Sequence, residues 1–213
     1  LEDIYAPYKA KRKTKAQKAI ERGLEPLADL ILSTSLSLEE LGKQKGSEFV
    51  GVGEDSVSSF KDAVEGARDI LIYRFSHDLE IKEELRSLFW SKGFLVSKKQ
   101  TDAEKIKDHS KFRDFFDYRE PIKSLNEPKA GHRYLAMRRG AVLKILKVEA
   151  WVEPDLALSL MRSKFLSSKE GLAHIDLLGE CVEKAYLLYL HPSLDLEIKT
   201  ELKRSSDETS IEV

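Results

Sequence analysis

The sequence is poor in the residues that mark secreted and membrane proteins. It contains a single cysteine, Cys181, which cannot form an intramolecular disulfide bond. It also contains no apolar run that approaches the roughly 18 residues of a membrane-spanning helix. We therefore expect a reducing, aqueous compartment, the cytoplasm, and no membrane partner.

Residue patterns typical of catalysis and metal binding are also missing. The five histidines lack the short spacings of metal-binding motifs, and no acidic cluster accompanies them. Gly51 and Gly53 lack the third glycine and the strand-turn-helix context of a dinucleotide-binding loop. Cys181 lies in an apolar helical pattern, which indicates a small buried side chain rather than a nucleophile. We expect no enzyme activity, no cofactor and no metal site.

Charge is distributed unevenly along the 213 residues, although the formal net charge is only −1. Residues 169–213 carry twice as many acids as bases, whereas residues 4–20 contain no acid. The basic side chains of this early segment are Lys9, Lys11, Arg12, Lys13, Lys15 and Lys18. Because the basic residues are concentrated in one segment, that segment can contact a polyanion. The net charge of the whole chain, taken alone, would argue against such a contact.

Hydrophobic periodicity and capping residues predict a mainly helical chain. Thr14 can cap a short helix that ends at Gly23, a residue suited to the left-handed position after a helix. Apolar residues at spacings of three and four continue this pattern along most of the sequence. The further helices that we expect cover 26–32, 38–41, 56–75, 128–139, 154–165, 168–190, a segment that either Ser76 or Asp78 begins and Gly93 ends, and a last segment that Ser193 begins.

Extended structure has few candidates. Residues 141–149 are rich in branched side chains and form the one clear strand candidate, while 93–99 is a candidate for a short extended piece. The glycine-containing segment 43–54 is expected to be a loop. We predict an all-α fold with at most one or two short strands. We further expect two helical regions, 1–100 and 101–213, in a chain whose ends continue in a longer protein.

Several blocks of the sequence are similar, in the same order, to motifs of one protein family. The first block is the opening stretch Leu1–Ala16, which is followed by Gly23–Ala28. The later blocks are Ala63–Ile70, Gly93–Ser97, Lys111–Tyr118 with Glu120–Ile122, and His132–Gly140. Through these blocks the sequence resembles the N-terminal region of the Tex family of RNA-binding transcription accessory proteins.

This resemblance implies a helical, partly helix-turn-helix-like region of a larger protein. The later parts of such proteins are a nuclease-like but inactive domain, helix-hairpin-helix motifs and an S1 domain, which is expected to dominate RNA binding. The resemblance thus implies nucleic acid as a partner, RNA in preference to DNA, and transcription machinery as a further partner. One departure is that Val142 follows Gly140 almost at once, where the family has a longer turn, so we expect a shortened loop.

Two groups of basic residues are candidates for nucleic-acid contact. The first is the basic segment already described, where Tyr5 and Tyr8 either stack on bases or pin the segment to the core. The second comprises Arg133, Arg138 and Arg139, which do not share one narrow helix face. Arg133 has the alternative of a structural ion pair or of covering Tyr134. The aromatic residues of 112–118 are expected to form core.

These observations leave two hypotheses of different classes. In the first, the chain is a helical scaffold that contributes electrostatic contacts to nucleic acid. In the second, it is a protein-interaction scaffold that packs on the remaining domains or on transcription machinery and touches no nucleic acid.

Overall fold

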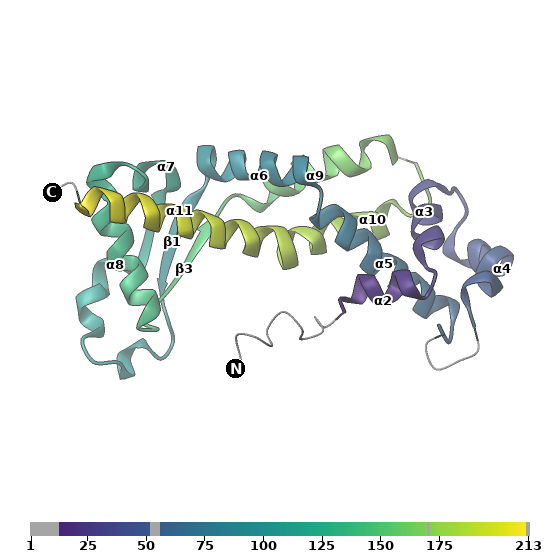
Figure 1. The fold of residues 1–213 in the computed structure, drawn as a ribbon, viewed down its shortest axis with the longest axis horizontal. Helices are drawn as coiled ribbons and strands as arrows, with labels where there is room; N and C mark the ends of the chain where they lie inside the picture. Colours follow the sequence, from purple (N-terminus) through teal and green to yellow (C-terminus); the bar gives the residue numbers. More distant parts are fainter. Residues whose placement is uncertain (1–12, 52–55, 170, 212–213) are drawn as a thin grey trace, which may run out of the picture. The chain divides into compact units, whose positions relative to one another are not determined.

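The computed structural model describes residues 13–51, 56–169 and 171–211, and these residues are predominantly helical (Figure 1). The predicted fold class is confirmed, and the small sheet has three strands, one more than the sequence suggests. The chain forms two compact units, which we call the first and second units. The first unit combines the described residues up to His77 with Phe165–Ala185, and the second combines Asp78–Lys164 with the described residues from Tyr186 onward. Both units are therefore assembled from separate stretches of sequence rather than from contiguous halves.

The first unit is built around one long helix, α5, which contacts four other helices. These elements are α2 (Lys15–Glu21), α3 (Glu25–Ser33), α4 (Leu38–Phe49), α5 (Phe60–Ser76) and α10 (Ile175–Ala185). The apolar stripe of α5 is buried, including Ala67, Ile70 and Leu71, each fully inaccessible. The periodicity of α5 thus supplies the core of this unit.

Local signals set both ends of α2 as predicted, whereas α5 is capped by Ser59 and not at the expected Ser56. The Thr14 hydroxyl accepts a hydrogen bond from the Gln17 backbone N–H, and the Gln17 side chain accepts one from the Thr14 N–H. Gly23 follows α2 with a φ of 76°. Because glycine adopts the left-handed backbone conformation at no steric cost, Gly23 turns the chain into α3 without strain.

The predicted loop over 43–54 is wrong for its first half, because α4 continues to Phe49. Two glycines inside this helix, Gly42 and Gly46, face the ring of Phe60. A Cβ atom at Gly42 would lie 2.9 Å from Phe60 Cδ1. The glycines therefore permit close packing of α4 on α5 rather than a turn.

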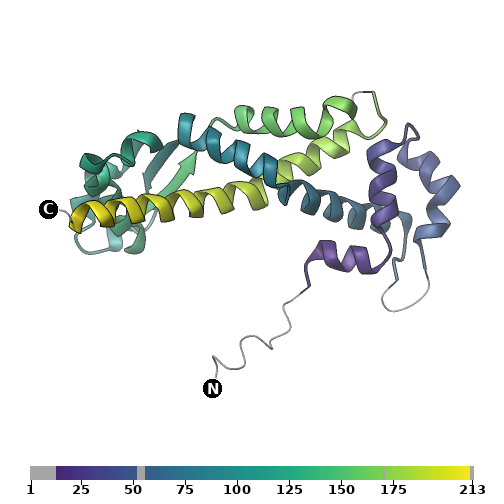
Figure 2. The ribbon, with the colours of Figure 1, turned by 45° about the horizontal axis from the view of Figure 1, so that its top comes forward.

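The second unit combines helices with the sheet. Its long helices are α6 (Leu79–Lys92), α8 (Gly131–Val142), α9 (Pro154–Leu166, to Lys164 in this unit) and α11 (His191–Ile211). Its strands are β1 (Phe94–Lys99), β2 (Asp117–Pro121) and β3 (Leu146–Trp151). Shorter elements are the helix α7 (Ile122–Leu125), the 3-10 turns η2 (Ala103–Lys105), η3 (His109–Phe115) and η4 (Pro128–Ala130), and the π-helical turn η6 (Tyr186–Leu190). In Figure 2, α11 is the long helix in yellow, and it contacts β3.

The sheet is antiparallel with the order β2-β1-β3, and its two faces differ in burial. Leu95, Ser97 and Ala150 lie on the inner face and are fully buried. Phe94 and Trp151, which pair directly across β1 and β3, lie on the opposite, outer face and are half-buried. The sheet is thus covered on its inner face and, within this unit, open on its outer face.

The expected end of the helix at Gly140 is wrong, and the strand that follows starts later than expected. Helix α8 continues to Val142, and the left-handed residue in the three-residue connection to β3 is Lys144, with a φ of 60°. A Cβ atom at Gly140 would lie 2.5 Å from Leu146 Cδ1 and 3.0 Å from Phe112 Cδ1. Gly140 is therefore a packing residue of the core and not a helix terminator.

Candidate nucleic-acid interface

The basic segment of the first unit is only partly described. Lys9, Lys11 and Arg12 lie outside the described residues. Lys13 forms an ion pair with Glu21 at 2.8 Å across the length of α2. Lys15 and Lys18 are exposed on α2.

The two lysines of α2 border a small cleft of 210 Å³. Its charged lining comprises Lys15, Lys18 and Arg22 opposite Asp62, Glu65 and Asp69 of α5. Burial raises the pKa of the Asp69 carboxyl, and the charge of Lys15 opposes that shift. Because acids of α5 face these bases, the cleft has mixed charge and the cations are partly compensated within the unit.

Arg133 of α8 forms a structural ion pair, which is one of the alternatives to nucleic-acid contact that the sequence offers for it. Its Nε and Nη2 donate to the two carboxylate oxygens of Glu120 at 2.9 and 2.6 Å. The Tyr118 hydroxyl donates to the same carboxylate at 2.5 Å. Burial disfavours the charged form of Glu120, but the bonds from Arg133 and Tyr118 outweigh it and hold the pKa of Glu120 below its ordinary value. Arg133 thereby fastens α8 to β2.

Arg138 and Arg139, also on α8, are exposed and make no ion pair within the described part of the chain. Arg138 and Arg139 are exposed whereas Arg133 is half-buried, in agreement with the prediction that the three arginines do not share one narrow helix face. The structure thus separates the sequence candidates into Lys13, Lys15 and Lys18 in the first unit and Arg133, Arg138 and Arg139 in the second.

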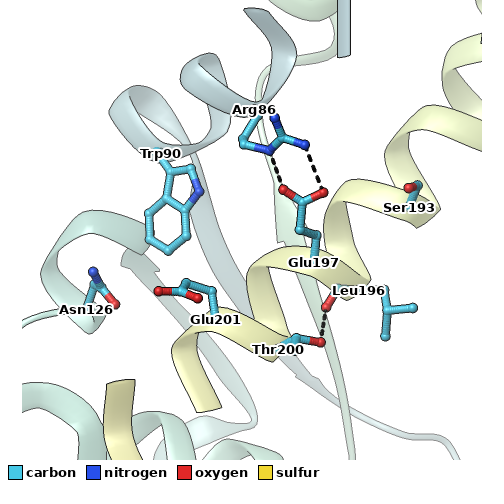
Figure 3. Close-up of a pocket in the computed structure, with 8 residues that line it drawn as sticks. All are labelled: Arg86, Trp90, Asn126, Ser193, Leu196, Glu197, Thr200 and Glu201. Atoms are coloured by element: carbon cyan, nitrogen blue, oxygen red, sulfur yellow. Dashed lines mark hydrogen bonds and ion pairs between the residues drawn. The ribbon is translucent and has the colours of Figure 1, made fainter. Parts of the chain in front are cut away.

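A groove in the second unit was not found by sequence reasoning (Figure 3). It has a volume of 680 Å³ and lies between α6, α11 and the residue that follows α7. Its lining residues are Arg86, Trp90, Asn126, Ser193, Leu196, Glu197, Thr200 and Glu201. The groove joins residues more than 100 positions apart in the sequence, so no local motif announces it. A tryptophan on the polar side of α6 was the one available signal.

Each charged residue that lines this groove takes part in an ion pair. Arg86 forms a two-pronged ion pair with Glu197, in which Nη2 and Oε2 are 3.1 Å apart. The hydrogen bond from Arg86 holds the pKa of Glu197 below its ordinary value. Glu201 is paired with Arg204 at 2.5 Å. Arg86, the cation of the lining, is already paired with an acid. The groove therefore suits a peptide segment with both polar and apolar side chains better than it suits a phosphate.

Ser193 also corrects a predicted helix end. It was expected to cap the last helix, but α11 begins at His191, and the Ser193 hydroxyl accepts a hydrogen bond from Lys82 Nζ at 3.1 Å. The side chain therefore joins α11 to α6 beside the groove.

The described residues contain no group of three or more histidine, cysteine, aspartate or glutamate side chains arranged to hold a metal ion. They also contain no helix with the length and apolar character needed to cross a bilayer.

Comparison with known proteins identifies the family. Residues 41–213 match the model of a family described as Tex central region-like. The whole chain aligns with the Protein tex of Bordetella pertussis at 34% identity and with the Transcriptional accessory protein Tex of Neisseria gonorrhoeae at 33% identity. It covers 27% of the length of each. Over 73% of the chain it is 38% identical to Protein YhgF of Escherichia coli, of which it covers 19%.

The sequence blocks suggest the N-terminal region of such proteins, whereas the matching family model describes a central region. The chain spans about a quarter of the length of the curated relatives that align with all of it. The match covers most of the chain and the relatives align from end to end, so this chain belongs to the Tex family.

Proposed function

We propose that this chain is a non-enzymatic helical scaffold of a Tex-family protein, in which it contributes nucleic-acid contacts to a transcription-related function in the cytoplasm. The observation that carries the proposal is the exposed pair Arg138 and Arg139, which no described acid neutralises. Lys15 and Lys18 provide a second, weaker set because acids of α5 face them. RNA is the expected nucleic acid, in keeping with the family resemblance.

The salt dependence of binding tests this function. We expect the chain to bind single-stranded RNA weakly, with log affinity falling against log salt concentration by about 0.7 for each phosphate contact. Replacing Arg138 and Arg139 by glutamine should reduce that slope by about 1.4 if both contact phosphates. The matched control is Arg162→Gln, since Arg162 is exposed on α9 and no acid pairs with it in the described ranges. A slope near zero for the unaltered chain contradicts the proposal.

The groove of Figure 3 favours a second candidate function, that of a protein-interaction scaffold. Leu196 is 68% exposed at its border, and a side chain of that kind gains free energy when a partner covers it. This candidate predicts that a longer Tex-family protein binds RNA equally well with and without the segment that corresponds to this chain. A loss of RNA affinity on removal of the segment favours the nucleic-acid scaffold instead.

A further inference from the structure

The outer face of the sheet carries aromatic and cationic side chains that none of the sites above uses. Phe94 and Trp151 pair across β1 and β3, and Arg119 lies on β2 opposite Val96. Lys98, two residues beyond Val96, shares this face. Burial alternates along β1, where Phe94 and Val96 are half-buried and Lys98 is exposed, so the same side of the sheet is open along its length. We call Phe94, Val96, Lys98, Arg119 and Trp151 the outer-face cluster.

Arg119 is held over the two aromatic rings. Its Cζ lies 3.7 Å from the centroid of the Phe94 ring and 4.5 Å from that of Trp151. The two ring centroids are 6.4 Å apart. Cation–π attraction restrains the guanidinium in this position and leaves its N–H groups as donors. Unpaired nucleic-acid bases stack both on aromatic rings and on arginine guanidinium planes.

The cations of this cluster form no ion pair in the described part of the chain, although Asp117 of β2 lies opposite Lys98 on the same face. Arg119 and Lys98 are both exposed, and neither makes an ion pair with any residue in 13–51, 56–169 or 171–211. By contrast, Arg86 and Arg133 of the same unit are each committed to a glutamate. On the same face, Lys147 pairs with Glu149 at 2.8 Å and is therefore compensated. An unpaired guanidinium with a fork of donors suits a phosphate oxygen pair.

We propose that the outer-face cluster binds single-stranded nucleic acid. Unpaired bases stack on Phe94, Arg119 and Trp151, while Arg119 and Lys98 contact the phosphates. A duplex hides the faces of its bases, so this surface prefers a single strand. The unpaired cations beside the rings favour a polyanion over a protein partner. This inference rests on the proposed nucleic-acid function and gives it a defined surface that the sequence motifs did not indicate.

The test uses fluorescence of Trp151 in the full 213-residue chain. The chain has two tryptophans, so Trp90→Phe leaves Trp151 as the single reporter. The parent with this change is titrated with an oligouridylate of about 12 nucleotides and with a duplex of equal length. We expect the single strand to quench Trp151 at saturation and the duplex to leave it nearly unchanged, because only the single strand can stack.

Arg119 variants in this parent separate stacking from charge. We expect Arg119→Ala to raise Kd by about tenfold and to lower the log–log salt slope by about 0.7. Arg119→Lys should keep the slope and still lose affinity, since it retains charge without a stacking plane. Lys98→Gln should lower the slope alone. The matched control Arg162→Ala should leave Kd and slope unchanged, and circular dichroism verifies that each variant is folded.

Several outcomes overturn the inference. One is equal quenching by single strand and duplex, and another is an equal effect of Arg119→Ala and Arg162→Ala. A change of Trp151 fluorescence with protein concentration, but not with oligonucleotide, would identify the outer face as a contact between proteins. If the oligonucleotide binds with a salt slope that Arg119→Ala leaves intact, this surface is wrong and the proposed function stands. If the parent binds no oligonucleotide, both are wrong.

Discussion

Arg133 and Glu120 are joined by two hydrogen bonds, from Nε and Nη2 of the arginine to the two carboxylate oxygens of the glutamate. The side chain of Glu120 is only 12% exposed, so little water reaches its carboxylate. The negative charge is instead balanced by Arg133, and the carboxylate receives a hydrogen bond from Tyr118. Arg133, which the sequence suggests as a nucleic-acid contact, therefore forms an ion pair that links α8 to β2.

The first prediction concerns this pair. Arg133→Ala should lower the denaturant midpoint of unfolding, because a largely buried carboxylate loses its two-pronged partner. Arg138→Ala and Arg139→Ala serve as controls on the same helix, and we expect them to leave the midpoint unchanged since both are exposed. An unchanged midpoint for Arg133→Ala contradicts a structural role for the pair.

The pH dependence of stability follows from the same contact. The folded pKa of Glu120 lies below its ordinary value, so the unfolded chain binds a proton first as pH falls. The stabilisation is fully present above the ordinary carboxyl pKa of about 4.3 and is lost as pH falls through the lowered folded value. Glu120→Gln should flatten this acid limb in urea unfolding curves measured between about pH 6 and 3. An acid limb as steep as that of the unaltered chain would argue against the shift.

Gly140 gives the second prediction, which tests packing. Alanine there places Cβ 2.5 Å from a buried Leu146 side chain, and over-packing costs about 1–3 kcal/mol. The gain in helix propensity of about 1 kcal/mol offsets part of this cost. We expect a net loss of up to about 2 kcal/mol in the free energy of unfolding. Gly179 in α10 is the control, since a Cβ there meets nothing within 4 Å, and Gly179→Ala should add about 0.5–1 kcal/mol.

The third prediction concerns His174, which is 4% exposed and whose Nε2 has no hydrogen-bond partner. Burial lowers the pKa of His174, against a smaller opposing effect of a hydrogen bond with the Leu36 backbone. The unfolded chain therefore takes up a proton near pH 6.5, where the folded chain does not. Stability should be complete above that pH and fall as pH drops through the lowered folded pKa. Titration of the His174 ring resonances should give a midpoint below the ordinary histidine value of about 6.5, and a midpoint above that value would contradict burial as the cause.

Cys181 gives the fourth prediction. It is fully buried, as its apolar pattern predicts, and burial raises the pKa of its thiol to about 11. Because the thiolate is the reactive form, labelling by a disulfide reagent near neutral pH should be slower than that of a free thiol by a factor on the order of 100 or more. The chain unfolded in urea should react at the free-thiol rate. Rapid labelling of the folded chain would show that the helix packing around Cys181 opens readily.

Local sequence accounts for most of the helices. Among the candidate site residues, it accounts for the position of Lys15 and Lys18 on α2. Thr14 and Gly23 set the ends of α2 as expected, since capping needs only neighbours in sequence. The loop predicted around Gly46 and the helix end predicted at Gly140 are wrong, because a glycine required for close packing has the same sequence appearance as one required for a turn. The expected regions 1–100 and 101–213 are contiguous, whereas the compact units interleave because α10 returns to pack on α5.

By itself the sequence determined the helical class, the buried state of Cys181 and the Tex resemblance, since periodicity, capping and ordered motifs are properties of short segments. Only the tertiary structure decided what the cations do. It paired Arg133 with Glu120, left Arg138 and Arg139 without acids in the described chain, and set Arg119 over Phe94 and Trp151. Those outcomes depend on which strands and helices become neighbours, and such long-range pairing is fixed by the packing of the whole core.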